Sequence, residues 1–280
     1  MGKGLLDPKV DFVFKNIFGS PNHPEILISF LNATLKAKKK IVNVDIKKTD
    51  IEKQYIEDKY SRLDVKATTS NDEIINIEIQ LKNENNMVKR SLYYLSKMYE
   101  EQLNEKEDYS KLVRTVCINI LNFKYLKTDN FHTGYRFKEI ESNEELTDIM
   151  EVHFIEIPKL QDSSDEKDML VAWTEFLKDP ESEKVRGLEL SIEEIRQAKD
   201  ELIRMSNDST QRELYDMRAN SLRDKMSELN AAERKGIEKG REEGRKEEKI
   251  EIARNMKLSG LDTNTIAKIT NLSEDEIDKL

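Results

Sequence analysis

The sequence predicts an α+β fold, with helices and strands mixed over the first 180 residues and a helical extension after them. Residues 61–82 alternate apolar and polar side chains on both sides of a turn, which is typical of an antiparallel hairpin. Residues 8–18 and 86–104 instead repeat apolar side chains at helical spacing. From about residue 181 the chain is rich in charged helix formers and has no strand pattern.

These patterns divide the chain into three regions. We expect a mixed domain at 1–180, a charged helical linker or oligomerisation segment at 181–256, and a small helix-turn-helix-like unit at 257–280. The 280 residues are enough for one to two domains with a real core. Charged residues make up 37% of the chain and the mean hydropathy is −0.74, so much helix surface is expected to face solvent.

The helices and strands of the first domain are expected in a definite order. One helix covers 8–18, and a second begins near Pro24, whose fixed φ suits a first helical turn. Helix 86–104 turns a row of four side chains toward the core, at Leu92, Leu95, Tyr99 and Leu103. Helix 165–178 places Trp173 in the core. Strands outside the hairpin are expected at 42–51, 112–122, 132–140 and 150–157.

The hairpin at 61–82 carries the residues that suggest chemistry. In its second arm, four apolar residues from 75 to 81 alternate with Asn76, Glu78 and Gln80, and in its first arm Val65 separates Asp64 from Lys66. The linking segment TTSND favours a turn. If the hairpin closes about Asn71, residue 64 faces residue 78 and residue 62 faces residue 80. Opposed residues of this kind have Cβ atoms about 4.5–5.5 Å apart.

Two opposed acids, Asp64 and Glu78, repel each other unless a proton or a cation lies between them. The simplest occupant is a hard divalent metal ion such as Mg²⁺ (or Mn²⁺), which takes carboxylate oxygens and keeps several waters. The alternative is that both acids are ordinary residues on the solvent-facing side of a hairpin. A slip of one residue in the register would also place them on opposite faces of the sheet.

Composition excludes several other classes of protein. The single cysteine, Cys117, cannot form an internal disulfide, and its apolar surroundings predict a buried core residue in a reducing compartment. With only three scattered histidines, no zinc site of usual spacing can be assembled. No apolar run approaches the ~18 residues of a membrane span. The start MGKGLLDPKV has no hydrophobic signal core, so we expect a cytoplasmic protein without a membrane partner.

Charge bears on nucleic-acid binding. The net charge of −9 disfavours bulk attraction to phosphates, although a local basic groove is compatible with it. In the extension, Gly236, Gly240 and Gly244 weaken a helix interior, which indicates either close helix–helix approach or a mobile linker. In the last segment we expect helices at 263–269 and 274–280, the second capped by Ser273 with Glu276. Its acidic residues would repel phosphates, so packing or dimerisation is favoured over base reading.

Several of these motifs occur together in one known family. The opening DFVFKNIFG, the RLDV strand, the EIQ strand and the following KRSLYYLSKMY helix resemble the recombination-promoting nuclease and transposase-like family, within the PD-(D/E)XK nuclease superfamily. The resemblance covers roughly residues 5–180, and the charged tail with its small helical unit is similar to tails of the same family. It implies a restriction-endonuclease-like core: an amino-terminal helix, a bent antiparallel sheet, a helix and another strand.

The resemblance also implies site residues. The metal-binding Asp of the superfamily matches Asp64, its second acid matches Glu78, and its Lys position is held by Gln80. A neutral amide supplies no positive charge, so Gln80 is expected to orient the attacking water by hydrogen bonds. Lys66 is the nearest candidate for replacing the lost charge. Arg90 and Tyr94, spaced i,i+4 on the next helix, are candidate contacts to the DNA backbone, although a surface-and-core pair is an equal alternative.

The function implied is a Mg²⁺-dependent DNA endonuclease linked to recombination or mobile elements. Asp64 and Glu78 would hold the ion, and Gln80 would position the nucleophile. Asp11 and Lys15 could flank the site, although an ordinary ion pair within the helix is the simpler reading. The competing functions are a catalytically inactive DNA- or protein-binding descendant that acts through its tail, and a partner protein that forms homo-oligomers through the C-terminal helices.

Overall fold

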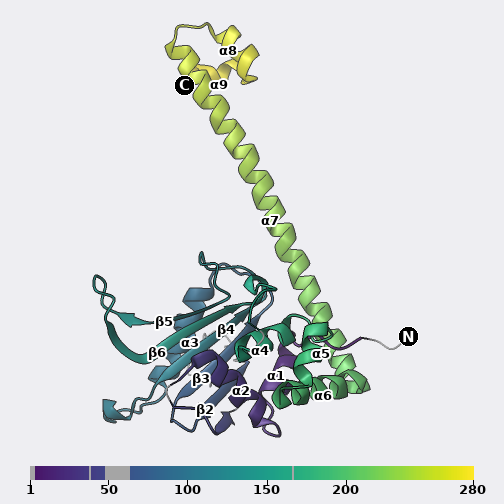
Figure 1. Cartoon of the computed structure of the whole chain (residues 1–280). Coiled ribbons are helices and arrows are strands. Elements are labelled where there is room, and N and C mark those ends of the chain that lie inside the picture. The colour runs from purple at the N-terminus through teal and green to yellow at the C-terminus, as the bar shows by residue number, and fades with distance from the viewer. Residues whose placement is uncertain (1–3, 38, 48–63, 166) are drawn as a thin grey trace. The chain divides into compact units, whose positions relative to one another are not determined.

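The structure, a computed structural model, describes residues 4–37, 39–47, 64–165 and 167–280. The chain divides into two compact units, Met1–Ala219 and Asn220–Leu280, and helix α7 (Ser209–Leu258) crosses the boundary between them. The helices and strands of both units are labelled in Figure 1. Each unit is described by itself.

The first unit is built on a mixed six-stranded sheet in the order β1-β2-β3-β4-β6-β5. Strands β3, β4 and β6 run parallel to one another, and the other neighbours are antiparallel. The three parallel strands form the buried centre of the sheet, in which β4 has every residue buried. The strands are β1 (Val44–Lys47), β2 (Val65–Thr69), β3 (Ile74–Gln80), β4 (Thr115–Leu121), β5 (His132–Lys138) and β6 (Glu145–Glu156).

The β2–β3 hairpin has the register that the alternating pattern predicts. Val65 pairs with Ile77 and Lys66 pairs with Asn76, so continuing the same register by one residue sets Asp64 opposite Glu78. The predicted pairing of residues 62 and 80 falls outside the described residues, because residue 62 belongs to the segment 48–63. The part of the expected strand 42–51 beyond Lys47 falls in the same segment.

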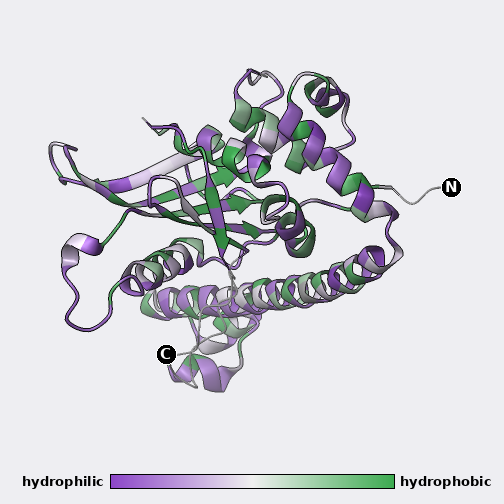
Figure 2. Cartoon of the chain, turned by 90° about the horizontal axis from the view of Figure 1, so that it is seen from below, coloured by the Kyte–Doolittle hydropathy of each residue, from purple (hydrophilic) through white to green (hydrophobic). Residues whose placement is uncertain are grey.

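Most of the helices cover one face of the sheet. Helix α2 packs on α1, α4 and α6, and α4 packs on α5. Figure 2 shows these helices and α3 on opposite sides of the largely hydrophobic strands. Trp173 of α4 is fully buried against Phe18, with ring centroids 5.3 Å apart, which confirms its predicted place in the core. These helices are α1 (Asp11–Phe18), α2 (Pro24–Leu35), α4 (Met169–Lys178), α5 (Glu183–Glu189) and α6 (Glu193–Asn207).

Helix α3 (Met87–Glu100) packs against β4 and β6 on the other face, and its buried row agrees only in part with the predicted one. Leu95 is buried as predicted, but Leu92 is 49% exposed, Tyr99 is half-buried and Leu103 lies beyond the helix end. The other side chains that face inward are Met87, Ser91, Tyr94 and Met98, and the Ser91 hydroxyl donates a hydrogen bond to Asn119 Oδ1 of β4, at 2.8 Å. Two short 3₁₀ helices, Tyr109–Lys111 and Ile157–Lys159, complete the unit.

The extension after residue 181 is helical throughout its regular elements, as predicted. However, α5 and α6 bury apolar side chains in the first unit, at Val185, Leu188, Ile195, Ala198, Leu202 and Met205. The first unit therefore takes in the beginning of the region that the sequence assigns to the extension. Helix α7 is largely hydrophilic, with scattered apolar residues (Figure 2).

The second unit comprises the later part of α7 together with α8 (Thr263–Thr270) and α9 (Glu274–Asp278). Its core is small, with Ala253, Ile266 and Ile277 fully buried. Helix α9 begins with the predicted capping box, in which Ser273 and Glu276 bond each other's backbone N–H groups. No helix among the described residues is apolar enough over a sufficient length to cross a membrane.

Candidate active site

The candidate active site lies where β2 begins and β3 ends. The β2–β3 register places Asp64 opposite Glu78, and the period of two places both side chains on the sheet face that α3 covers. Alternate residues on this face of β3 are Asn76, Glu78 and Gln80, while Ile75, Ile77 and Ile79 point to the opposite, apolar face. The hairpin therefore brings the two predicted acids together.

Asp64 is held at one of its two carboxylate oxygens. The backbone N–H of Ile79 donates a hydrogen bond to Asp64 Oδ2 at 2.8 Å, which ties the carboxylate to the neighbouring strand. The other oxygen, Oδ1, lies 3.9 Å from the Nζ atom of Lys15 on helix α1. The residue is 8% exposed, so one edge of the carboxylate remains accessible.

Glu78 is more deeply buried and is held by two side chains. Arg90 Nη2 of α3 lies 3.2 Å from Glu78 Oε2, and Asn76 Nδ2 donates to Glu78 Oε1 at 3.4 Å. Both partners follow from local structure: Asn76 precedes Glu78 by two residues on one strand face, and Arg90 lies one turn into the helix above it. Asn76 Oδ1 and Arg90 Nε are buried, and neither has a hydrogen-bond partner among the described residues.

The electrostatics of the pair disfavour two negative charges. Burial, together with the nearby Asp64 charge, raises the pKa of Glu78 from 4.5 to about 7, although Arg90 acts in the opposite direction. Burial likewise raises the pKa of Asp64 to about 6, against the lowering effects of the Ile79 hydrogen bond and Lys15. Without a cation between them, the two acids therefore keep their protons to a higher pH than ordinary carboxylic acids, Glu78 more so than Asp64.

The other predicted site residues lie near the pair in different environments. Gln80 shares the face of Glu78 and is half-buried. Lys66 shares the face of Asp64, but its Nζ atom lies 3.5 Å from Glu101 Oε2. Arg90 contacts Glu78 and lies over the ring of Tyr94, 5.3 Å from the ring centroid. Tyr94 is buried, with 7% of its surface exposed, and its ring packs against the Arg90 guanidinium.

Sequence reasoning gave too little weight to the opening helix. Lys15 contacts Asp64, and the negative charge of Asp11 also acts on Asp64. Asp11 forms an ion pair with Arg218 of α7, in which Arg218 Nη1 lies 3.1 Å from Asp11 Oδ2. This replaces the ion pair with Lys15 that was expected within the helix. A signal was present in the opening DFVFKNIFG, because Asp11 and Lys15 share a helix face on a motif that the family resemblance includes. The contact of Asn76, whose amide donates a hydrogen bond to Glu78, was not predicted from the sequence.

The residues present fit a hard divalent metal ion. Asp64 offers a carboxylate oxygen without a hydrogen bond, and Glu78 is a buried acid whose charge is opposed by its neighbour. A cation between them would relieve this repulsion, and oxygen ligands suit Mg²⁺ or Mn²⁺. No cluster of three or more His, Cys, Asp or Glu residues able to hold a metal occurs in the described ranges, so an ion here would keep waters in its remaining positions.

Cys117 lies on the same sheet face and is fully buried. Burial, together with the charge of Glu78, raises the pKa of its thiol to about 12, so the group stays protonated at neutral pH. It is the buried core residue that the sequence predicts, and it is unsuited to act as a nucleophile.

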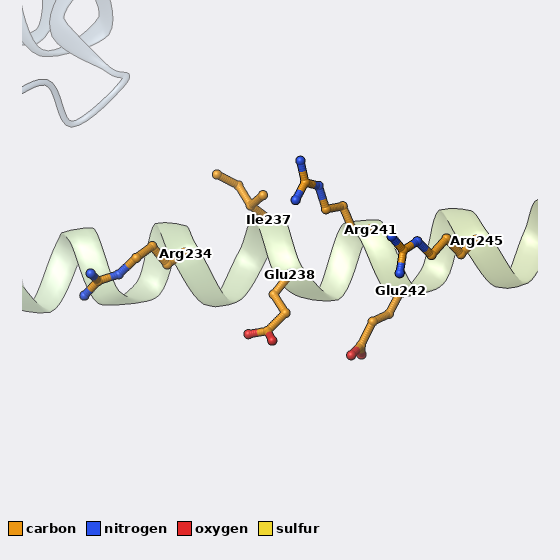
Figure 3. A pocket seen from close by; sticks show the side chains of 6 residues that line it. All are labelled: Arg234, Ile237, Glu238, Arg241, Glu242 and Arg245. Atoms are coloured by element: carbon orange, nitrogen blue, oxygen red, sulfur yellow. The ribbon is translucent and has the colours of Figure 1, made fainter.

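Two surface hollows, one in each unit, are lined by residues other than the two acids. An apolar one of about 260 Å³ is lined by Val88, Leu92, Leu126, Tyr135, Val152 and Phe154. The other lies along α7, where Figure 3 shows Ile237 and Arg241 on one side of the helix and Glu238 and Glu242 on the other. All of its lining residues come from a single helix, so it does not enclose a ligand. The apolar hollow has no charged residue in its described lining, and the α7 hollow has arginines and glutamates on one exposed helix without the buried, opposed pair of acids found at the β2–β3 hairpin.

Comparison with known families agrees with this geometry. The family described as PD-(D/E)XK nuclease family transposase matches residues 8–232, which include α1, the hairpin and α3. The chain belongs to this family. Its mixed six-stranded sheet with a helical C-terminal region is therefore a PD-(D/E)XK nuclease-like fold, as the sequence predicts.

The end of the chain matches a second family. Residues 246–280 are similar to the C-terminal HTH domain of the Rpn/YhgA-like nuclease family. This match covers the end of α7 with α8 and α9, and an HTH domain suggests DNA binding. Neither the curated proteins nor the solved structures contain a significant match to the chain.

Proposed function

We propose that this PD-(D/E)XK family member is a metal-dependent DNA endonuclease, linked to recombination or to mobile elements. The observation that carries the proposal is the convergence of Asp64 and Glu78 on one sheet face, each with a raised pKa. Such a pair is suited to a divalent cation, and its place on the hairpin of this family favours phosphodiester hydrolysis. The buried Cys117 favours a reducing compartment, and we place the protein in the cytoplasm.

The residues have separate roles in this proposal. Asp64 and Glu78 would hold Mg²⁺ or Mn²⁺, which when bound lowers the pKa of water and stabilises negative charge on the phosphate. Gln80 would orient the attacking water through its amide. The water oxygen forms a bond to phosphorus, one bridging P–O bond breaks, and a proton from the water ends on solvent or on the leaving oxygen. Asn76 and Arg90 fix the orientation of Glu78.

The contacts to DNA are proposed from the cationic side chains around the site. Lys66 and Arg90 are both partly exposed and lie at the edge of the two acids, where a phosphate backbone would pass. The ring of Tyr94 lies beneath the Arg90 guanidinium, so we assign it to DNA binding through its support of Arg90.

The first prediction concerns Asp64→Asn, which keeps the shape of the side chain and removes its charge. Supercoiled plasmid incubated with the wild-type chain and Mn²⁺ or Mg²⁺ should be nicked, whereas the variant should lose at least about 100-fold in rate because it cannot hold the ion. The matched control is Asp45→Asn, an exposed carboxylate on β1 that should leave the rate unchanged. Equal, metal-independent nicking by wild type and Asp64→Asn would exclude the proposal.

The HTH match supports a second candidate function. The chain could be an inactive descendant of the nuclease fold that binds DNA or protein through its tail, since the tail carries a domain of a DNA-binding class. Absence of any metal-dependent cleavage, combined with DNA binding, would favour this candidate. Homo-oligomerisation through the C-terminal helices is part of the same proposal. It predicts fewer chains per complex in solution when the second unit, Asn220–Leu280, is deleted.

A further inference from the structure

The cationic side chains around the two acids differ in what they contact. The Arg90 guanidinium faces Glu78 and lies over Tyr94. The Lys66 ammonium lies 3.5 Å from Glu101, which is 25% exposed at the end of α3. The Lys15 ammonium faces Asp64 Oδ1 itself. Among these three, Lys15 is the cation on the carboxylate oxygen that has no hydrogen bond from the backbone.

Lys15 is held near this oxygen without being fixed to it. Its Nζ atom is 3.9 Å from Asp64 Oδ1, which is too long for a hydrogen bond. The helix that carries it is anchored by the buried side chains of Phe14, Ile17 and Phe18, so the base of the lysine is rigid. The flexible end is 26% exposed and can therefore move by a small distance toward a ligand beside Asp64.

The site needs a positive charge from outside β3, because the strand that carries Glu78 has no cationic residue. Residue 80, two positions beyond Glu78 on the same face, is the neutral Gln80. Hydrolysis of a phosphodiester develops negative charge on the phosphate, and a positioned cation stabilises that charge most in a site shielded from water. Gln80 can form hydrogen bonds to the water but cannot supply this charge.

We propose that Lys15 is a catalytic lysine of this chain, whose ammonium contacts the attacking water or a non-bridging oxygen of the scissile phosphate when DNA is bound. The inference rests on the proposed nuclease function and assigns the positive charge of that site to α1. It replaces the earlier candidate Lys66, whose ammonium is directed to Glu101. The lysine stays charged throughout, while the P–O bond to water forms and the bond to the leaving oxygen breaks.

The test compares Lys15→Met with Lys15→Arg in the full-length chain, at saturating DNA and Mn²⁺. We expect Lys15→Met to lose about 100-fold or more in turnover rate, as when one positioned charge-stabilising group is removed. Lys15→Arg keeps a positive charge and should remain within about tenfold of wild type. Lys89→Met, which removes an exposed lysine from α3, controls for general attraction to DNA and should keep the wild-type turnover rate.

A second readout is the binding of Mn²⁺ alone, measured by calorimetric titration without DNA. Lys15→Met should bind Mn²⁺ as tightly as wild type or more tightly, because a positive charge beside Asp64 repels the ion. Asp64→Asn should lose this binding. A combined fall in Mn²⁺ affinity and turnover in Lys15→Met would overturn the proposal, because it would make Lys15 a support of Asp64 only.

The sharpest test is rescue from the neighbouring strand. Gln80→Lys, introduced into the Lys15→Met variant, should recover at least tenfold in turnover rate, because it returns the charge to the same site from β3. Failure of rescue, or full turnover in Lys15→Met while wild type cleaves DNA, would overturn the role of Lys15 and leave the nuclease function standing. If the wild type itself neither binds Mn²⁺ nor cleaves, both proposals fall.

Discussion

At the residue scale, the site depends on two acids whose charges are unfavourable in the metal-free protein. Glu78 is almost fully buried and is paired with Arg90, yet burial and Asp64 still raise its pKa to about 7. A protein that only needed stability would gain by replacing one of these acids with a neutral residue. The presence of both acids agrees with the cation that the proposed function places between them.

The unfavourable burial of these two charges can be measured as a pH dependence of the free energy of unfolding. Because the folded-state pKa of Glu78 and of Asp64 is raised, the folded protein binds more protons than the unfolded chain between about pH 4 and pH 7. The free energy of unfolding of the metal-free protein should therefore fall as the pH rises through this window. Glu78→Gln should remove about 1–3 kcal/mol of that fall between pH 5 and pH 8.

The measurement is urea unfolding with a chelator present, at several pH values, for wild type and Glu78→Gln. Groups that do not interact with Glu78 cancel in the difference between the two curves, which therefore reports the titration of Glu78 together with that of its neighbour Asp64. Parallel curves would mean that Glu78 titrates in the folded protein as it does in the unfolded chain, and the acids would then not repel each other. Added Mn²⁺ should raise the wild-type curve most at high pH, where both acids are ionised.

At the element scale, the sequence predicted what depends on short-range pattern. The β2–β3 register follows from strict alternation on both arms, so Asp64 and Glu78 were correctly placed opposite each other. The parallel pairing of β3, β4 and β6 joins strands that are distant in the chain, and no local pattern contains it. The inward face of α3 differs from the prediction at Leu92, because the rotation that buries Met87, Tyr94, Leu95 and Met98 turns Leu92 toward solvent.

The sequence places the two acids opposite each other, but it does not place the cations that contact them. Asp64, Glu78 and Gln80 share one hairpin, whereas Lys15 reaches Asp64 from a helix 49 positions earlier in the chain. The partner of Arg90 also depends on how α3 crosses the sheet, so sequence alone could assign it only to a DNA contact. Contacts of this kind are fixed by packing and could not be read from spacing.

The edge of the sheet away from the acids has a polar network that should be important for stability. Glu151 of β6 is buried and accepts from His153 Nε2 at 2.7 Å and from the side chains of Arg114 and Arg136. Burial alone would raise the pKa of Glu151, but the hydrogen bonds from His153 and Arg114 lower it to about 2. His153 in turn bonds His132 through its other ring nitrogen, at 2.9 Å.

Glu151→Gln should therefore destabilise the protein by about 3 kcal/mol at pH 7, because it removes the buried negative charge that His153 and the two arginines stabilise. Arg114 keeps its second partner Glu73, and Arg136 keeps Glu145. A depressed pKa gives stability that is present above about pH 4.5 and is lost as the pH falls toward 2, so the effect should shrink in acid. Urea unfolding at pH 7 and pH 3 measures both. Glu145→Gln, an exposed partner of Arg136, is the control and should cost less than about 1 kcal/mol. An equal cost for the two variants would rule out the network as a source of stability.

At the scale of the whole molecule, the chain combines a nuclease-like unit with a small helical unit of the HTH class. The net charge of −9 does not favour general attraction to DNA, so the second unit is a reasonable source of binding energy. The acidic first turn of α9 argues against base reading by that helix, which leaves α8 and the end of α7 as candidate contact surfaces.

Unfolding the second unit within the full chain tests this division. Ile266→Asp puts a charge into the core formed with Ala253 and Ile277, and should unfold that unit while the first remains folded. If the second unit contributes to binding, the affinity for DNA should fall at least about tenfold, with turnover at saturating DNA retained. Fluorescence anisotropy with a labelled duplex measures the affinity. Ile269→Asp, at an exposed position of α8, is the matched control. Unchanged affinity for Ile266→Asp would assign DNA binding to the first unit.

The most direct test of the metal site is a crystal structure of the full-length chain with Mn²⁺, in which anomalous scattering locates the ion. The proposed function predicts one manganese peak between Asp64 Oδ1 and the Glu78 carboxylate, absent from the Asp64→Asn variant. Saturating Mn²⁺ without a peak at these two acids, or with the two carboxylates turned to opposite sides of the sheet, would contradict it.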